Sequence, residues 1–110
     1  TSIGRSYYAL FNVVRGALSA EGVIFRQASD DHHALVSYLT QAKHRAIGHV
    51  GHALKDLRVE RNRADYDMTN AIGVGTSEFL YEKAKAAIAQ FDSIPPVELK
   101  EIVRRIQAIP

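Results

Sequence analysis

The 110-residue sequence contains no cysteine, and it has only three prolines and seven glycines. Without cysteine, the chain can form no disulfide, no thiolate zinc site, no iron–sulfur cluster and no thiol nucleophile. No apolar run approaches the roughly 18 residues that a membrane-spanning helix needs, and no segment has the charged, apolar and small-residue order of a signal peptide. We therefore expect a cytoplasmic protein that makes no membrane contact and is stabilised by the packing of its apolar side chains.

An excess of one charge sign is also missing. The 14 Lys and Arg residues against 12 Asp and Glu residues leave a formal net charge of +2, too small to indicate nucleic-acid binding by bulk electrostatics. Any contact with RNA or DNA must therefore depend on a local basic cluster. The composition, 46% hydrophobic and 24% charged, and the length both fit one globular domain over residues 1–110. Because the chain starts at Thr1 inside a patterned segment, we expect the full-length protein to have further N-terminal residues.

Apolar residues recur at steps of three and four through most of the chain, which is the spacing of one buried helix face. No segment alternates with period two for long enough to form a strand. Gly22 is a stop signal for the first helix, and Pro96 can occupy the first position of the last one. The pattern predicts an all-α, up-and-down bundle of about five helices. The predicted helices cover residues 2–20, 31–45, 47–65 and 77–91, and a fifth from residue 96 onward.

The connection between the third and fourth predicted helices, residues 66–76, has no apolar period. Its string Gly73-Val74-Gly75 lacks the lysine and the preceding strand of a phosphate-binding P-loop, so it is interpreted as a turn. Thr76 or Ser77 is expected to cap the helix that follows.

Arg61 stands where the apolar pattern of the third helix calls for a leucine. Residues 47, 50, 54 and 57 are apolar, and the next step of four falls on this arginine. A buried guanidinium costs several kcal/mol unless it finds partners. One interpretation is a helix-end arginine that reaches water or pairs with Asp65, one turn later. The other is an anion-binding arginine that acts together with Arg58 and Arg63, the densest basic cluster in the chain.

Two further groups of side chains have a structural and a functional interpretation. Tyr7, Phe11 and Tyr38 lie on predicted core stripes, so we interpret them as core residues rather than as platforms for base stacking. A polar face of the third helix is expected to be solvated, with a phosphate-contacting patch as the alternative. No His-Glu-x-x-His string supports a metal site there, and we predict no metal and no cofactor. The residues of that face are Lys43, His44, Arg45, His49 and His52.

Two motifs resemble a known family: RSYYALF at residues 5–11 and RNRADYD at residues 61–67, together with His32 or His33 at the start of the second predicted helix. They are similar to the small prokaryotic members of the HEPN superfamily, over about residues 5–91. The resemblance implies a helical bundle that forms a homodimer and places the arginine segments of two protomers in a shared cleft. It also implies RNA as a ligand and a nucleotidyltransferase-type or other defence-module protein as a partner.

The active members of this family carry a histidine that is separated from the motif arginine by four to six intervening residues. The positions counted from Arg61 hold Tyr66, Asp67 and Met68 instead. A phenol with a pKa of about 10 and a carboxyl with a pKa of about 4 both exchange protons poorly near pH 7. The resemblance therefore implies a degenerate ribonuclease motif, in which Arg61 can still hold a phosphate and Tyr66 is the one catalytic candidate left in the motif.

Three functions follow as expectations. The first is an RNA- or nucleotide-proximal component of a prokaryotic toxin–antitoxin or antiviral defence module, which acts mainly through dimerisation and partner binding, with Arg58, Arg61, Arg63 and Asp65 around the phosphate. The alternative is an active, metal-independent endoribonuclease in which Arg61 binds phosphate at the dimer cleft and Tyr66, or a histidine brought in by the dimer, transfers the proton. A third is a helical assembly module whose arginines pair internally.

Overall fold

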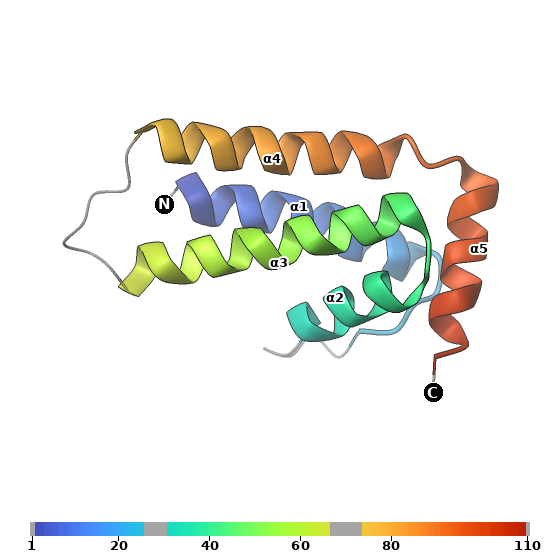
Figure 1. Ribbon diagram of the computed structural model, residues 1–110. Coiled ribbons are helices and arrows are strands. Elements are labelled where there is room, and N and C mark those ends of the chain that lie inside the picture. Colours follow the sequence, from blue (N-terminus) through green and yellow to red (C-terminus); the bar gives the residue numbers. More distant parts are fainter. Residues whose placement is uncertain (1, 26–30, 67–73, 110) are drawn as a thin grey trace.

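The computed structural model is an all-α bundle of five helices (Figure 1). It describes residues 2–25, 31–66 and 74–109, and the side chains of residues 5–25, 31–63 and 78–109. These residues contain no strand, as the sequence predicts. The helices are α1 (Ser2–Ala20), α2 (Asp31–Gln41), α3 (Arg45–Tyr66), α4 (Val74–Asp92) and α5 (Pro96–Gln107).

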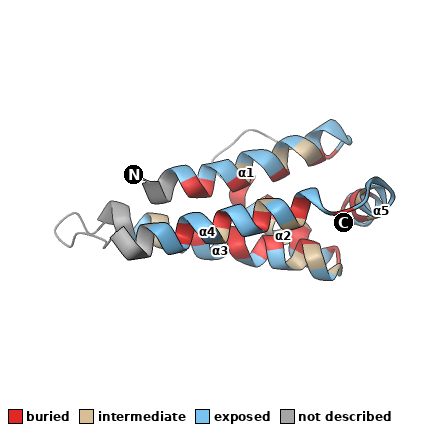
Figure 2. Cartoon of the chain, turned by 90° about the horizontal axis from the view of Figure 1, so that it is seen from above, coloured by how far each residue is buried: buried red, intermediate tan, exposed pale blue. Residues whose placement is uncertain are grey.

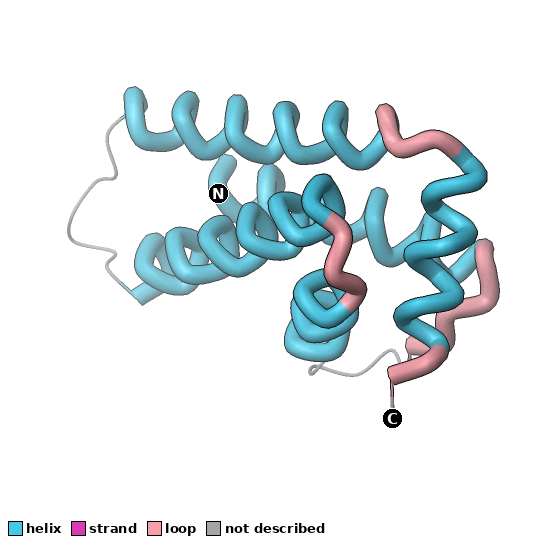
Figure 3. Tube along the Cα trace, turned by 45° about the vertical axis from the view of Figure 1, so that its right-hand side comes forward, coloured by secondary structure: helices cyan, strands magenta, loops and turns pink. Residues whose placement is uncertain are grey.

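The three long helices form the body of the bundle. α1 packs against α3 and α4, α3 and α4 pack against each other, and α2 packs on α3. α5 turns across the end of the bundle at which α4 finishes and contacts α2 (Figures 1 and 3). No helix among the described residues is both long and apolar enough to cross a membrane.

The core lies between these helices, where the buried residues face inward (Figure 2). The apolar stripes of the sequence are confirmed for most positions, because their leucines, isoleucines and valines are the most completely buried side chains, whereas Phe79 of the predicted α4 stripe is 66% exposed. Each such side chain contributes about 1.5–3 kcal/mol through burial. The largest of them are Leu10, Val14, Leu18, Leu35, Leu39, Ile47, Val50, Leu54, Leu57 and Ile102.

Gly22 ends α1, as predicted. Its backbone is left-handed, with φ at +99°. The Gly22 N–H donates to the Ser19 carbonyl at 3.0 Å and the Val23 N–H donates to the Leu18 carbonyl, also at 3.0 Å. These two bonds are the Schellman pattern, and both Val23 and Leu18 are buried. A residue with a Cβ would be strained at this φ.

The predicted boundary between the second and third helices is wrong, because α2 ends at Gln41 and α3 begins at Arg45. Lys43 adopts a left-handed φ of 53° between them, a conformation that no helix continues through. His44 then caps α3: its Nδ1 accepts the Ile47 N–H at 3.4 Å. A side chain that satisfies an early N–H group allows a helix to start there.

The predicted start of the fourth helix is wrong as well. α4 begins at Val74, so Val74 and Gly75 are helical rather than part of a turn, and Thr76 and Ser77 lie inside the first turn rather than before it. Gly73 lies outside the described residues. The first N–H groups of a helix have no intrahelical acceptor, and one glycine costs only about 1 kcal/mol, so Gly75 does not prevent the helix from starting early.

The start of α5 agrees with the sequence. Pro95 is the N-cap and Pro96 takes the first helical position. One helical turn apart on this helix, Arg105 Nε lies 3.3 Å from Glu101 Oε1.

Candidate functional site

Arg61 lies against two tyrosines of α1. Its Cζ atom is 5.4 Å from the centre of the Tyr7 ring and 5.0 Å from the centre of the Tyr8 ring. One turn beyond Leu57, α3 therefore faces aromatic rings rather than aliphatic side chains. A guanidinium over an aromatic face gains about 0.5–2 kcal/mol, more where water is excluded. This contact explains how an arginine can continue an apolar stripe.

Tyr7 connects α1 to the start of α2. It is buried, and its hydroxyl lies 2.6 Å from Nδ1 of His32, which is also buried. Burial raises the pKa of Tyr7 to about 12, against the opposing effect of Arg58 and Arg61. Burial, followed by the positive charge of Arg58 and the neighbouring His33, lowers the pKa of His32 to about 4.

Both groups are therefore neutral at pH 7. Because a phenol hydroxyl is a stronger donor than a neutral imidazole N–H, and an imidazole nitrogen a stronger acceptor than a phenol oxygen, we assign the bond as a Tyr7 hydroxyl that donates to His32 Nδ1, with the ring proton on Nε2. The pair joins α1 to α2 below the Arg61 guanidinium.

Arg58 brings a second guanidinium to the same place. It precedes Arg61 by three residues, so both project from one face of α3. Its Nη1 lies 3.3 Å from Nε2 of His33, an exposed residue at the start of α2. Because a guanidinium has only donors, Arg58 donates and His33 accepts.

These side chains enclose a hollow of about 320 Å³. Its aromatic wall comes from α1, where Tyr8 is 48% exposed and can still meet a ligand. Asp31, the one carboxylate among the described residues of its lining, lies 3.2 Å from Nη2 of Arg15, which neutralises it. Two guanidiniums beside an accessible aromatic ring can hold a phosphate and stack a base. The lining residues are Tyr7, Tyr8, Phe11, Asp31, His32, Arg58 and Arg61.

The basic cluster of the sequence is divided. Arg58 and Arg61 share the hollow, whereas Arg63 is largely exposed and lies 3.6 Å from Glu60. Arg63 lines a different groove, of about 470 Å³, between α3 and α4. It therefore does not share that hollow with the other two arginines, and its predicted phosphate contact stays a prediction. The side chains of Asp65 and Tyr66 lie outside the described part of the chain.

The sequence names Tyr8 as one of the tyrosines that could stack a base but does not assign it to a site, and it does not place His32 against Tyr7. The prediction that Tyr7 is a core residue is confirmed, and Phe11 and Tyr38 pack against the core while partly buried. The ring of Tyr7 nevertheless also forms a wall of the hollow. Consecutive helix residues are rotated by about 100°, so Tyr8 points toward the edge of the face that buries Tyr7, and this was the available signal that Tyr8 is exposed.

The polar face at the other end of α3 is solvated, as predicted. Arg45, His49 and His52 are exposed, and His49 Nδ1 accepts from Gln90 at 3.4 Å. His44 is a helix cap and lies 3.4 Å from Glu98. Within the described residues, no three His, Asp or Glu side chains are grouped as metal ligands.

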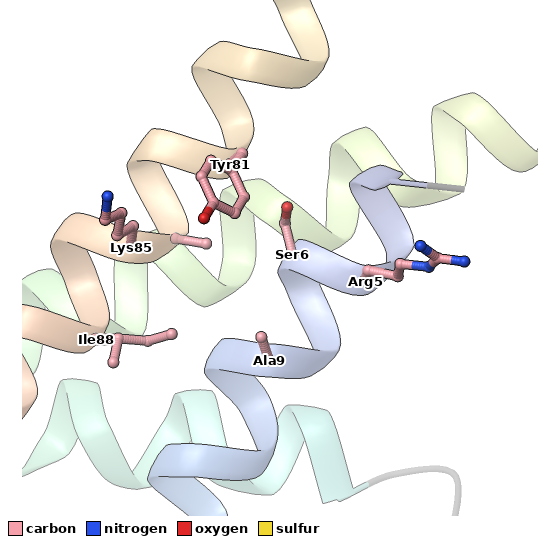
Figure 4. A pocket seen from close by; sticks show the side chains of 7 residues that line it. Arg5, Ser6, Ala9, Tyr81, Lys85 and Ile88 are labelled. Atoms are coloured by element: carbon pink, nitrogen blue, oxygen red, sulfur yellow. The ribbon is translucent and has the colours of Figure 1, made fainter.

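A further hollow, of about 520 Å³, lies between α1 and α4 (Figure 4). Its floor is apolar, with Ala9 and Ile88 facing each other across the two helices, and the charged ends of Arg5 and Lys85 lie far apart at its rim. It thus lacks the grouped cations of the hollow around Arg61.

Comparison of the chain with protein-family models, with curated proteins and with solved structures finds no match. The membership suggested by the motifs at residues 5–11 and 61–67 therefore stays a prediction.

Proposed function

We propose that the protein is a HEPN-type RNA-binding domain that holds a phosphate with Arg58 and Arg61, stacks a base on Tyr8 and does not cleave the strand. The observation that carries this proposal is the position of the Arg61 guanidinium over the two tyrosine rings, beside Arg58 in one hollow. The function extends the expected role in a toxin–antitoxin or antiviral defence module, with a homodimer and a nucleotidyltransferase-type or other module protein as partner.

Phosphate is the ligand that this arrangement favours. A guanidinium stacked on a ring keeps its N–H groups at its edge, where they can donate to two phosphate oxygens at once. Tyr8 supplies an aromatic face next to that phosphate, and base stacking on such a face contributes about 1–3 kcal/mol. The combination of donor pairs and an accessible ring suits a nucleotide better than a lone inorganic anion.

The chemistry of His32 supports binding without cleavage. A general acid or base acts best with a pKa near the working pH, whereas the pKa of His32 is lowered to about 4 by burial and by nearby positive charge. Its Nδ1 also accepts the Tyr7 hydroxyl. His32 therefore has neither a proton to donate through Nδ1 at pH 7 nor a free Nδ1 lone pair.

A metal-independent endoribonuclease is the second candidate, and His33 is the observation that favours it. This exposed imidazole lies 3.3 Å from Arg58, so a phosphate held by the arginines would have a titratable group beside it. His33 could then exchange a proton with the ribose 2′-OH while Arg61 stabilises the charge that develops on the phosphate.

Binding to a fluorescein-labelled single-stranded RNA, followed by fluorescence anisotropy, tests the proposal. Arg58→Ala and Arg61→Ala should each weaken binding by roughly tenfold or more, since each removes charge-assisted hydrogen bonds. Arg104→Ala is the matched control, because Arg104 is an exposed arginine on α5 that pairs with Glu101. Equal affinities for all four proteins would contradict the proposal, provided that circular dichroism shows each variant folded.

The same samples distinguish the two candidates. Incubation with RNA in EDTA should leave the strand intact under the binding proposal. Cleavage that persists in EDTA and disappears in His33→Ala would instead establish the endoribonuclease. Light scattering at micromolar concentration tests the homodimer, and a monomeric mass would rule it out.

A further inference from the structure

A second hollow adjoins the first and continues away from it between α2 and α3. Its volume is about 600 Å³, and it shares His32 and Arg58 with the 320 Å³ hollow around Arg61. Arg58 therefore stands at the junction of the two. The lining of this α2–α3 groove consists of His32, His33, Val36, Ser37, Thr40, Lys55, Arg58, Val59 and Asn62.

The α2–α3 groove has the chemistry of a nucleic-acid backbone site. Lys55, Arg58 and Asn62 follow one another on α3 at steps of three and four residues, so they form one row along the groove. Among the described residues that line it, none carries a carboxylate. The nearest acid in sequence, Asp56, lies on the other side of α3, where Lys83 binds it at 2.8 Å.

The opposite wall supplies hydroxyl groups. Thr40 Oγ1 donates to the Val36 carbonyl at 2.9 Å, which leaves its oxygen lone pairs available as acceptors. Ser37 Oγ accepts from Gln41, so its own proton can be donated. Ribose hydroxyls, which are both donors and acceptors, match such a wall.

We propose that the groove between α2 and α3 binds the backbone of a single-stranded RNA whose neighbouring base is stacked in the hollow around Arg61. The inference rests on the proposed function and specifies its ligand as an oligonucleotide rather than a free nucleotide. Proteins that bind single strands combine a basic groove along the backbone with aromatic side chains for the bases. Here the groove and the aromatic wall are separate chambers that meet at Arg58, so a mononucleotide contacts one chamber and a longer strand contacts both.

The length of the ligand provides the test. Adenosine monophosphate, the dinucleotide ApA and hexa-adenylate are to be compared as competitors of a labelled hexa-adenylate. The affinity should rise by more than tenfold from the mononucleotide to the hexamer. Lys55→Ala should weaken hexamer binding by roughly threefold to tenfold and lower the slope of log K against log salt by about 0.7, the value for one phosphate contact on a single strand.

Two further variants complete the design. Asn62→Ala should also weaken the hexamer, because Asn62 lies on the same row of α3. The matched control is Lys85→Ala, an exposed lysine that lines the hollow between α1 and α4 instead. Neither Lys55→Ala nor Asn62→Ala should change binding of the mononucleotide.

Each outcome decides the inference. Hexamer binding that is unaffected by Lys55→Ala and Asn62→Ala, or no stronger than mononucleotide binding, would overturn the groove while leaving Arg58 and Arg61 as the proposed phosphate site. Equal affinity for duplex RNA would also overturn it, since a paired base cannot enter the aromatic hollow. If Arg58→Ala and Arg61→Ala each bound both the mononucleotide and the hexamer as tightly as the original protein, the proposed function would be contradicted. The inference would then fail as well.

Discussion

Histidine and arginine side chains lie at both ends of α3, but the side chains at the two ends contact different partners. At the N-terminal end, His44 accepts the Ile47 N–H, and Arg105 of α5 donates to the Ala42 carbonyl at 3.1 Å and the Lys43 carbonyl at 3.2 Å. At the C-terminal end, Arg61 lies over aromatic rings and Arg58 meets an imidazole.

The difference shows that the partner, not the residue type, decides what a cation does. Backbone carbonyls at a helix end carry partial negative charge, so Arg105 is matched and stabilises the fold. Aromatic rings and neutral imidazoles carry no formal negative charge. Burial lowers the pKa of His32 most, and the positive charge of Arg58, His33 and Arg61 lowers it further. Under the proposed function, the charge of the two arginines attracts the phosphate to this end of α3.

The largest expected effect is a loss of stability in acid that belongs to the C-terminal end alone. An unfolded histidine has a pKa of about 6.5, whereas that of His32 is about 4. Between these values the unfolded chain takes up a proton that the folded chain does not. The free energy of unfolding should therefore fall as the pH is lowered from 6.5 to 4, by up to about 3 kcal/mol. Urea denaturation at a series of pH values measures this change.

Two variants isolate the effect. His32→Asn keeps a side-chain acceptor for the Tyr7 hydroxyl but does not titrate, so its stability should change less over the same pH range. His49→Gln removes an exposed histidine near the other end of α3 and should keep the acid sensitivity of the original protein. Identical pH profiles for His32→Asn and the original protein would show that His32 is not the responsible group.

Removal of the Tyr7 hydroxyl should have the next largest effect. Tyr7→Phe leaves Nδ1 of the buried His32 without its donor, and an unsatisfied buried acceptor costs about 1–3 kcal/mol. Thermal or urea unfolding at pH 7.5 measures the loss. Tyr8→Phe is the matched control, because Tyr8 is 48% exposed, and it should stay within about 0.5 kcal/mol. Similar losses in the two variants would mean that the Tyr7–His32 bond does not stabilise the packing of α1 on α2.

Much of the fold could be predicted because its signals are local. The apolar period from Ile47 to Leu57 defines a helix face within α3 itself, and Gly22 and Pro96 act on their immediate neighbours. The end of α2 could not be predicted in this way. Arg105 donates to the carbonyl of the left-handed Lys43. Because Arg105 lies 62 residues later in the chain, no local sequence pattern predicts this contact.

The candidate site could be predicted only in part for the same reason. Arg61 was found because it breaks an apolar stripe, which is a local signal. His32 and Tyr7 are 25 residues apart and meet only when α2 packs beside α1, so their bond needs the tertiary structure. The separation of Arg63 from Arg61 follows from a local signal: two residues beyond Arg61 correspond to a rotation of about 200° around the helix axis, which points the Arg63 side chain away.

The smallest expected effect is at the N-terminal end of α3, and it tests whether the two ends are separate. Arg105→Ala removes the donor to the carbonyls of Ala42 and Lys43 and should lower the free energy of unfolding by about 1 kcal/mol. RNA affinity should not change, because this arginine lies on α5, away from the hollow around Arg61. Lys100→Ala, an exposed lysine on the same helix, should alter neither stability nor binding. If Arg105→Ala weakened RNA binding as much as Arg58→Ala does, the turn before α3 would have to be coupled through α3 to Arg58 and Arg61 at its other end. The two ends of α3 would then not have separate functions.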